Sequence, residues 1–255
     1  MNVRALLDRT PIASVGLALM RDATGRDAPL EAIRPARAER LAQDARIAFW
    51  SLAAGVGTST TAALVAHRSA GAGSPPILVD LDRWAPSLAL RAGIEAATVS
   101  DALVQPDRER DLLSRWEGVT FLPGSPHLHR EYDGPRIAAL VARVARGRPL
   151  VIDLGAGADA LDADVMSGLT RLCVVTGGRA SQLQAAFAAR ELLRRASLAV
   201  GVAVVGVEAG DAQLIATRIG LPLLGAIPHD AFLARDEFAA RAPTMRAVDA
   251  LIRSL

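Results

Sequence analysis

The sequence predicts an α/β fold, with a doubly wound, mostly parallel seven-stranded sheet and helices on both of its faces. The chain has 255 residues, 51% of them apolar, which is enough to bury a full core. From residue 46 onward, short continuous apolar runs alternate with stretches of helical periodicity. Strands that are apolar throughout are typical of a parallel sheet that is covered on both sides.

Seven apolar runs are the predicted strands, and helical periodicity separates most of them. The strands are expected at residues 47–50, 76–81, 119–122, 150–154, 172–176, 199–207 and 223–227. The helices are expected at residues 59–69, 87–92, 100–104, 107–115, 135–146, 181–195, 211–219 and 244–254. Because helices connect successive strands, those strands are expected to run parallel.

The chain is expected to divide into an N-terminal extension, residues 1–45, and a folded domain, residues 46–255. Three prolines interrupt the extension and leave room only for short helices near 3–9 and 37–44. We expect the extension to pack on the domain or to bind a partner.

Neither a leader peptide nor a membrane span is expected. The apolar stretch 12–20 lacks a preceding basic cluster and is followed by Arg21 and Asp22, unlike a secretory signal. No apolar run reaches the roughly 18 residues that crossing a bilayer requires. The sequence therefore predicts a cytoplasmic protein without a transmembrane segment.

Composition excludes several kinds of chemistry. The single cysteine, Cys173, rules out an intrachain disulfide and a thiolate zinc cluster. All 29 basic residues are arginine, so no lysine is present for a Schiff base or for phosphate neutralisation. The net charge of +2 is already present within residues 1–46, which hold eight Arg and six acidic residues. This distribution does not indicate a dedicated nucleic-acid binder, and DNA is not an expected partner.

The loop after the first predicted strand has the composition of an anion-binding site. Residues 51–61 read SLAAGVGTSTT, with glycines at 55 and 57 before a helix that begins near Ser59. Such glycines let backbone N–H groups converge, and the helix N-terminus adds its dipole and hydroxyl groups. A glycine turn with Ser or Thr at a helix start is also ordinary capping, so the spacing alone leaves both interpretations open.

Four segments, in order, resemble the ParA/MinD family of deviant P-loop ATPases. Residues 77–82 (ILVDLD) look like the family's V-D-x-D segment, 150–154 (LVIDL) like its Walker-B strand, and 223–230 (LLGAIPHD) like its L-G-x-I-P-x-D segment. The family's first loop follows the pattern S-x-K-G-G-V-G-K-T-T. The residues that match this pattern are Ser51, Gly55, Val56, Gly57, Ser59 and Thr60.

The same loop departs from the family at both of its lysines. Ala53 stands in place of the signature lysine and Thr58 in place of the P-loop lysine. The resemblance implies that the P-loop lysine neutralises the β- and γ-phosphates, and that the signature lysine reaches across a dimer to the partner's nucleotide. Removal of such charges typically slows catalysis by orders of magnitude, so fast ATP hydrolysis is not expected.

The resemblance also implies roles for individual residues if ATP or ADP binds with Mg²⁺. Weak binding is expected, and a chain that binds no nucleotide at all is an equally open alternative. Ser59 would supply the magnesium hydroxyl, Thr60 an α-phosphate contact, and Asp153 a magnesium contact through water. Asp80 and Asp82 would lie near the γ-phosphate, one of them orienting water. The remaining expected phosphate contacts are Gly55, Val56, Gly57 and Thr58.

Acidic residues at strand ends have a second interpretation. Asp80, Asp82 and Asp153 could each cap a loop by accepting backbone hydrogen bonds, with no ligand involved.

Within the family, a degenerate Walker A loop resembles the CpaE/TadZ branch. That resemblance implies a non-hydrolysing or very slow scaffold that positions a Flp pilus, a secretion machine or a division assembly. The expected partners are proteins of that assembly and a second copy of the chain, in a homodimer that forms without ATP. These partners would bring the protein to the membrane periphery or to a cell pole. The alternative is an active partitioning or septum-placement ATPase that uses arginine in place of lysine.

An alternative from another class rests on one motif. Residues 151–157 (VIDLGAG) look like the first motif of S-adenosylmethionine methyltransferases, although Ala160 stands where a third glycine is usual. The next predicted strand ends without the acidic residue that would hold a ribose.

Other polar clusters are interpreted as structural. His127 and His129 lack a defined third metal ligand, so a surface loop is favoured. Arg235, Arg241 and Arg246 are interrupted by acidic residues, which argues against a DNA patch. Cys173 and the apolar face of helix 244–254 are expected in the core. That apolar face consists of Val248, Leu251, Ile252 and Leu255.

Overall fold

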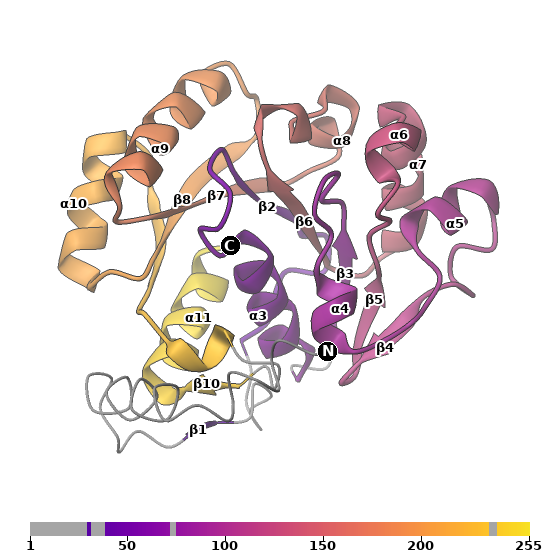
Figure 1. Ribbon diagram of the computed structural model, residues 1–255, viewed down its shortest axis with the longest axis horizontal. Coiled ribbons are helices and arrows are strands. Elements are labelled where there is room, and N and C mark those ends of the chain that lie inside the picture. The colour runs from indigo at the N-terminus through magenta and orange to yellow at the C-terminus, as the bar shows by residue number, and fades with distance from the viewer. Residues whose placement is uncertain (1–29, 32–38, 72–74, 235–238) are drawn as a thin grey trace, which may run out of the picture.

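The computed structural model describes residues 30–31, 39–71, 75–234 and 239–255, and it contains a central eight-stranded sheet (Figure 1). Neighbouring strands are parallel throughout, except at one edge, where β4 runs antiparallel to β5. In spatial order the strands are β4 (Ser114–Trp116), β5 (Val119–Leu122), β3 (Ile77–Asp80), β6 (Leu150–Ala156), β2 (Arg46–Ser51), β7 (Arg171–Gly177), β8 (Ala199–Val205) and β9 (Leu223–Ile227). A separate two-stranded antiparallel sheet joins β1 (Leu30–Glu31) to β10 (Ala240–Arg241).

Helices cover both faces of the sheet (Figure 1). One face carries α3 (Thr58–Ala70), α4 (Leu88–Ala92) and α11 (Ala242–Ser254). The other carries α5 (Val99–Val104), α6 (Leu128–Glu131), α7 (Gly134–Ala145), α8 (Ala163–Ser167), α9 (Ala180–Leu193) and α10 (Ala209–Ile219). Two short 3-10 helices are η1 (Ala158–Ala160) and η2 (Ala231–Ala234).

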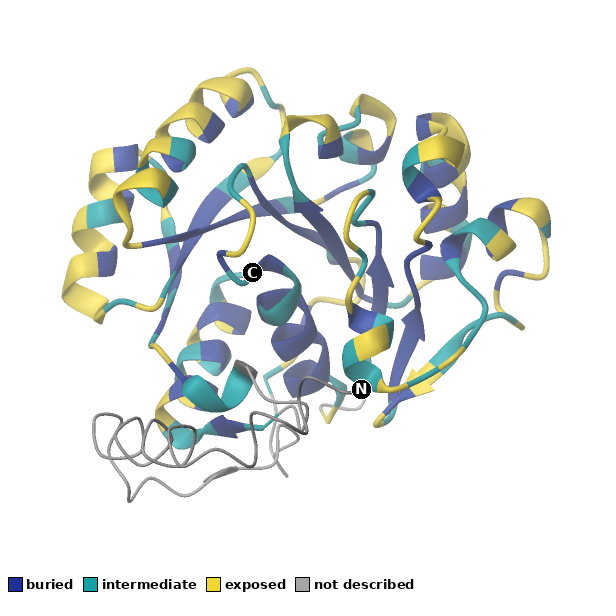
Figure 2. Ribbon diagram, in the orientation of Figure 1, coloured by how far each residue is buried: buried dark blue, intermediate teal, exposed yellow. Residues whose placement is uncertain are grey.

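The strands divide the core into two layers. Successive residues of a strand face opposite sides, so Ile47 and Phe49 of β2 pack with α3 and α11, while Ala48 and Trp50 pack with the other layer. Both layers are buried (Figure 2), which explains why these strands are apolar throughout. Cys173 is fully buried in β7, as predicted.

Helix α3 is enclosed by the sheet and by α11. Four of its 13 residues are alanine, and such small side chains allow the helix to lie close to the strands. Arg68 on α3 forms a two-pronged ion pair with Asp249 on α11, with Nε–Oδ1 and Nη2–Oδ2 distances of 2.5 and 2.6 Å. Val248, Leu251 and Ile252 of α11 are buried, which confirms the predicted use of that apolar face.

The seven predicted strands all form, but the sheet has eight, and the prediction of seven was wrong. The additional strand is β4, which lies in a segment that was expected to be helical up to residue 115. Glu117 and Gly118 have φ values of 43° and 86° and connect β4 to β5. Two successive positive φ angles are the signature of a tight hairpin, so this turn fixes the segment as a strand.

The predicted short helix near 37–44 is also wrong over the residues described. Residues 39–45 form no helix. Leu41 is buried, and Gln43 donates from Nε2 to the Gly147 carbonyl at 3.2 Å. The segment therefore packs on the domain as an irregular stretch that leads into β2. The expected helix at 3–9 lies outside the described residues. Within the described part of the chain, no helix is long and apolar enough to cross a bilayer.

Candidate functional site

The loop after β2 turns sharply at two glycines and runs directly into α3. Gly55 and Gly57 have φ values of 73° and 96°, in the left-handed region that favours glycine. Gly57 caps α3, and its carbonyl accepts hydrogen bonds from the Thr61 backbone and hydroxyl groups, both at 2.8 Å. The helix N-terminus therefore opens at the carboxyl edge of the sheet, where parallel α/β folds bind ligands.

A pocket of about 430 Å³ lies at this edge and is shared by the loops after β2, β3 and β6. Most of the predicted phosphate contacts line it, whereas Val56 is buried and lines neighbouring pockets instead. Thr58, at the lysine position, is buried. The lining residues are Ala54, Gly55, Gly57, Thr58, Ser59, Thr60, Asp82, Ala85, Ser87, Gly155 and Ala156.

Two carboxyl groups are buried behind this pocket. Asp80 at the end of β3 lies in register with Asp153 of β6, and neither has any exposed surface. Burial raises the pKa of Asp153 to about 6, although the nearby Ser59 hydroxyl and the Gly155 N–H oppose that shift. Burial raises the pKa of Asp80 well above its ordinary value, and the charge of Asp153 raises it further. Each carboxyl group therefore loses its proton less readily while the other is ionised.

The hydrogen bonds of these acids bear on the capping interpretation. Asp80 accepts from the backbone of Asp82 at 3.1 Å and of Leu88 at 3.4 Å, so it holds the loop after β3. The Asp82 carboxylate accepts from two backbone N–H groups, at residues 84 and 85, and also lines the pocket. Asp153 differs, because its Oδ2 is buried with no hydrogen-bond partner among the described residues. An orphaned buried carboxylate oxygen is a candidate for a ligand contact.

The donor set suits a magnesium ion carried by phosphate rather than a protein-built metal site. Among the residues described, no three His, Cys, Asp or Glu side chains are grouped to hold a metal. Magnesium usually binds through one or two protein oxygens together with substrate phosphates. Ser59 on the pocket wall and Asp153 behind it fit that arrangement.

An adjoining pocket of about 330 Å³ extends from Gly57 to the loop after β9 and includes Pro228 and His229. Its cationic side chain is Arg91 of α4, which donates from Nη1 to the Thr60 hydroxyl at 2.9 Å and from Nη2 to the Leu233 carbonyl. Sequence reasoning did not identify Arg91. It is 31 residues from Thr60, and no local motif marks it.

The contacts of Trp84 and Arg83, which sequence reasoning also did not identify, anchor the loop after β3. Trp84 donates from Nε1 to Asp159 at 2.6 Å and stacks on His129, with ring centroids 5.1 Å apart. The neighbouring Arg83 lies over the ring of Tyr132, 3.2 Å from its centroid. These contacts connect the pocket rim to η1 and α6. Trp84 and Tyr132 stand out in the sequence as aromatic residues, but their partners are distant in sequence, so these contacts could not be predicted from it.

The last of the four segments that carry the resemblance has a structural role at its acid. Asp230 accepts from the Arg241 backbone at 2.7 Å and from the Thr244 hydroxyl at 2.8 Å, which anchors the start of α11. Arg235 lies outside the described residues, so the predicted weakness of a patch with Arg241 and Arg246 stays a prediction.

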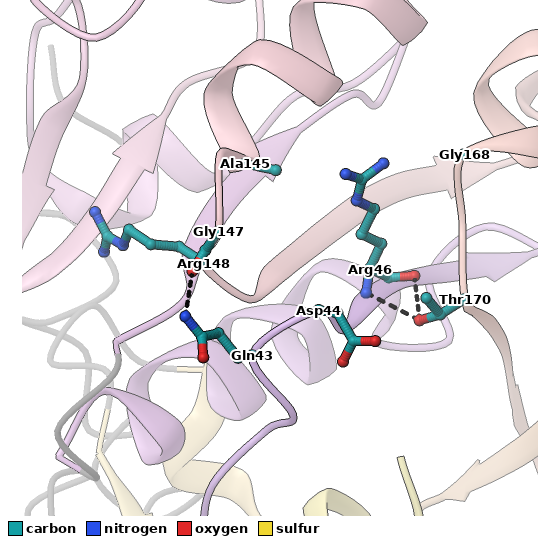
Figure 3. A pocket seen from close by; sticks show the side chains of 8 residues that line it. All are labelled: Gln43, Asp44, Arg46, Ala145, Gly147, Arg148, Gly168 and Thr170. Atoms are coloured by element: carbon teal, nitrogen blue, oxygen red, sulfur yellow. Dashed lines mark hydrogen bonds between the residues drawn. The ribbon is translucent and has the colours of Figure 1, made fainter.

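A larger pocket, of about 630 Å³, lies at the opposite, amino ends of the strands (Figure 3). Thr170 accepts at its hydroxyl from the Arg46 N–H at 2.9 Å and donates to the Arg46 carbonyl at 3.2 Å. Gln43 is bonded to the Gly147 carbonyl. Because these lining groups are bonded to each other and the glycine loop is at the other end, the carboxyl-edge pocket remains the candidate site.

Comparison with solved structures identifies the fold. The septum site-determining protein MinD complexed with Mg-ADP from Pyrococcus horikoshii OT3 superposes with a TM-score of 0.68 at 21% identity, over 82% of this chain and 94% of that one. The MinC:MinD cell division protein complex of Aquifex aeolicus gives 0.67 at 16% identity, with the same coverage of 82% and 94%. A ParA family ATPase from Chlorobium tepidum TLS gives 0.66 at 18% identity, over 82% and 92%.

No protein-family model and no curated protein matches the sequence. The matched fold does not support the methyltransferase interpretation of residues 151–157. The chain has the α/β P-loop NTPase fold that these MinD and ParA proteins share.

Proposed function

We propose that this protein is a MinD/ParA-like scaffold that binds Mg-nucleotide weakly and hydrolyses ATP very slowly or not at all. The observation that carries the proposal is the missing positive charge at the glycine loop. Ala53 and Thr58 occupy the two lysine positions of the resemblance, and the chain contains no lysine. Backbone donors and a helix dipole can still attract phosphate, but they do not replace a cation in the transition state.

The residues of the carboxyl-edge pocket suit Mg-ADP or Mg-ATP. The loop from Gly55 to Thr60 would surround the phosphates, with Ser59 on the metal and the unpartnered Oδ2 of Asp153 behind it. A bound magnesium ion would neutralise part of the phosphate charge. The Mg-ADP in the matched Pyrococcus protein supports this assignment.

The scaffold role rests on the comparison with MinD in complex with MinC. We propose that partner proteins of a pilus, secretion or division assembly bind this chain, as the CpaE/TadZ resemblance implies. Residues 1–45, whose strand β1 pairs with β10, would then contribute to the surface that such a partner binds. In this proposal, bound nucleotide modulates how the scaffold binds its partners, and hydrolysis of the nucleotide is not the function of the protein.

One observation favours a second candidate, an active partitioning or septum-placement ATPase. Arg91 places a guanidinium on the Thr60 hydroxyl and lines the pocket next to the glycine loop. In this alternative Arg91 supplies the charge that lysine normally supplies. Its planar guanidinium is larger than an ammonium group, which argues for a slower reaction.

Two measurements on the full chain test the proposal: ATP affinity by calorimetry and phosphate release. We expect weak binding, and we expect Thr58→Lys to tighten it by about tenfold, because a cation on the β- and γ-phosphates is restored. Thr217→Lys, on the exposed face of α10, is the matched charge control and should change nothing. Wild-type turnover that both Asp153→Ala and Arg91→Gln abolish would overturn the scaffold proposal and support the second candidate.

A further inference from the structure

A second positively charged pocket lies at the edge of the sheet where β4 pairs with β5. Its volume is about 390 Å³, and it opens at the amino ends of β3 and β5, away from the glycine loop. We call it the arginine pocket, because four arginines from three separate segments line it. They are Arg110 in the loop before β4, Arg115 in β4, and Arg146 and Arg148 in the turn between α7 and β6.

These four charges have no acidic partner within the ranges that the structure describes. Among the described residues, no carboxylate forms an ion pair with any of the four. The acids on either side of Arg110 are already engaged, since Glu109 pairs with Arg143 at 3.1 Å and Asp111 with Arg108 at 3.5 Å. A solvated charged face usually mixes both signs, so a concave group of one sign is unusual.

Arg148 is the fixed member of the group. Its guanidinium donates to the Pro75 carbonyl at 2.8 and 3.2 Å and to the Thr120 hydroxyl at 3.1 Å. Arg148 also lines the larger pocket of Figure 3, where its side chain points away from Arg46. Burial lowers the pKa of Arg148, and the charges of Arg115 and Arg110 lower it further, so the guanidinium groups are close enough to repel one another.

Arg146 is held in an unfavourable backbone conformation. Its φ is 24°, while Gly147 beside it takes φ 79°. A left-handed backbone is unfavourable for a residue other than glycine, because the Cβ atom comes too close to the following carbonyl oxygen. Residues in strained backbone conformations cluster at ligand sites and active sites.

Arginine guanidinium groups bind phosphate oxygens in pairs, and bound phosphate would relieve their mutual repulsion. The pocket is within the size range of small-ligand sites, roughly 300–1,000 Å³. One phosphate would balance only part of the charge of four arginines. We propose that the arginine pocket binds a compact polyphosphate anion, with two or three linked phosphate groups, as a site separate from the glycine loop.

Nucleic acid is the competing ligand, since its backbone also presents phosphates. The shape of the site favours the compact anion, because the arginines converge on a pocket rather than following an extended stripe. The net charge of +2 on the whole chain gives little general attraction for DNA.

Isothermal titration with sodium tripolyphosphate tests the proposal at about 150 mM salt, where weak surface attraction is screened. We expect one tripolyphosphate per chain in the arginine pocket, and binding of orthophosphate at least about tenfold weaker. Arg115→Gln combined with Arg146→Gln should weaken tripolyphosphate binding at least about tenfold. Both side chains are exposed, so the fold should persist, and circular dichroism checks this.

The matched control is Arg130→Gln combined with Arg218→Gln, two exposed arginines on α6 and α10. It removes the same charge outside the pocket and should leave binding unchanged. Equal weakening in both double variants, or equal affinity for orthophosphate and tripolyphosphate, would overturn the proposal. Absence of tripolyphosphate binding would do so too, whether or not duplex DNA binds.

Discussion

Asp80 and Asp153 occupy neighbouring strand ends, and neither side chain reaches solvent. Two adjacent buried carboxylates are unfavourable when both are ionised, so the folded protein holds protons that the unfolded chain releases. A group whose pKa is raised in the folded state contributes stability at low pH and loses it as pH rises. For Asp153 that loss falls between its ordinary pKa near 4 and its folded value of about 6.

We therefore predict that Asp153→Asn stabilises the protein above neutral pH. The amide keeps the shape, can accept from the Gly155 N–H, and carries no charge toward Asp80. The gain in unfolding free energy should be of the order of 2 kcal/mol near pH 8 and about half of that near pH 5, which lies midway between the two pKa values. Urea unfolding at the two pH values measures it, with Glu95→Gln, at an exposed position, as the control. A variant that is less stable than the wild type near pH 8 would show that Asp153 is held ionised by a favourable partner.

Several residues of the candidate site could be predicted because they are close together in sequence. The glycine loop and the start of α3 form one continuous segment, and the acids at strand ends follow from the parallel topology. Arg91 and Trp84 could not be predicted in the same way. Their partners, Thr60 for Arg91 and His129 and Asp159 for Trp84, are brought near only by the folded loops.

At the scale of the elements, the contact between α3 and α11 combines apolar packing with one ion pair. The side chain of Arg68 is 7% exposed and that of Asp249 18%, so the pair is poorly hydrated. Removal of one partner leaves the other charge largely buried, which costs more than the pair itself contributes.

We predict that Asp249→Asn destabilises the protein by about 2–3 kcal/mol. Replacement of both residues, Arg68→Leu with Asp249→Leu, should cost less than the sum of the single changes, because no unpaired charge remains. The matched control is Glu39→Gln, which breaks the exposed pair between Glu39 and Arg253 of α11 and should cost less than about 1 kcal/mol. Chemical denaturation measures the stability of each variant, and equal losses from Asp249→Asn and Glu39→Gln would contradict the prediction.

The elements themselves were predictable to different degrees. The seven parallel strands were predictable because burial on both faces leaves them apolar throughout. Strand β4 was not, because its three residues form at the sheet edge and depend on the turn at Glu117 and Gly118. Helices α6 and α8 have four and five residues, too few for periodicity to be visible.

At the scale of the whole molecule, the carboxyl edge of the sheet presents small and apolar groups to solvent. Ala54 and Gly55 are exposed at the glycine loop. On the adjoining segment, Trp84 is 64% and Leu90 is 85% exposed. Small residues let two backbones approach closely, and a twofold dimer is the commonest way to bury such a face.

We predict a homodimer that forms through this edge without ATP. Leu90→Arg should convert it to a monomer, because a charge would be buried at the contact. Leu214→Arg, on the exposed face of α10, makes the same change elsewhere and should leave the dimer intact. Light scattering at micromolar concentration, with and without ATP, distinguishes the outcomes. A chain that associates only after ATP is added would refute the prediction.

The attachment of Trp84 to Asp159 and His129 also has an optical consequence. Trp50 and Trp116 are buried, so Trp84 is the indole that water and collisional quenchers reach among the three tryptophans. It is located at the rim of the carboxyl-edge pocket, two residues after Asp82. Fluorescence that acrylamide can quench thus comes from the loop after β3, which gives the native chain an intrinsic reporter of any rearrangement at that rim, with no label attached.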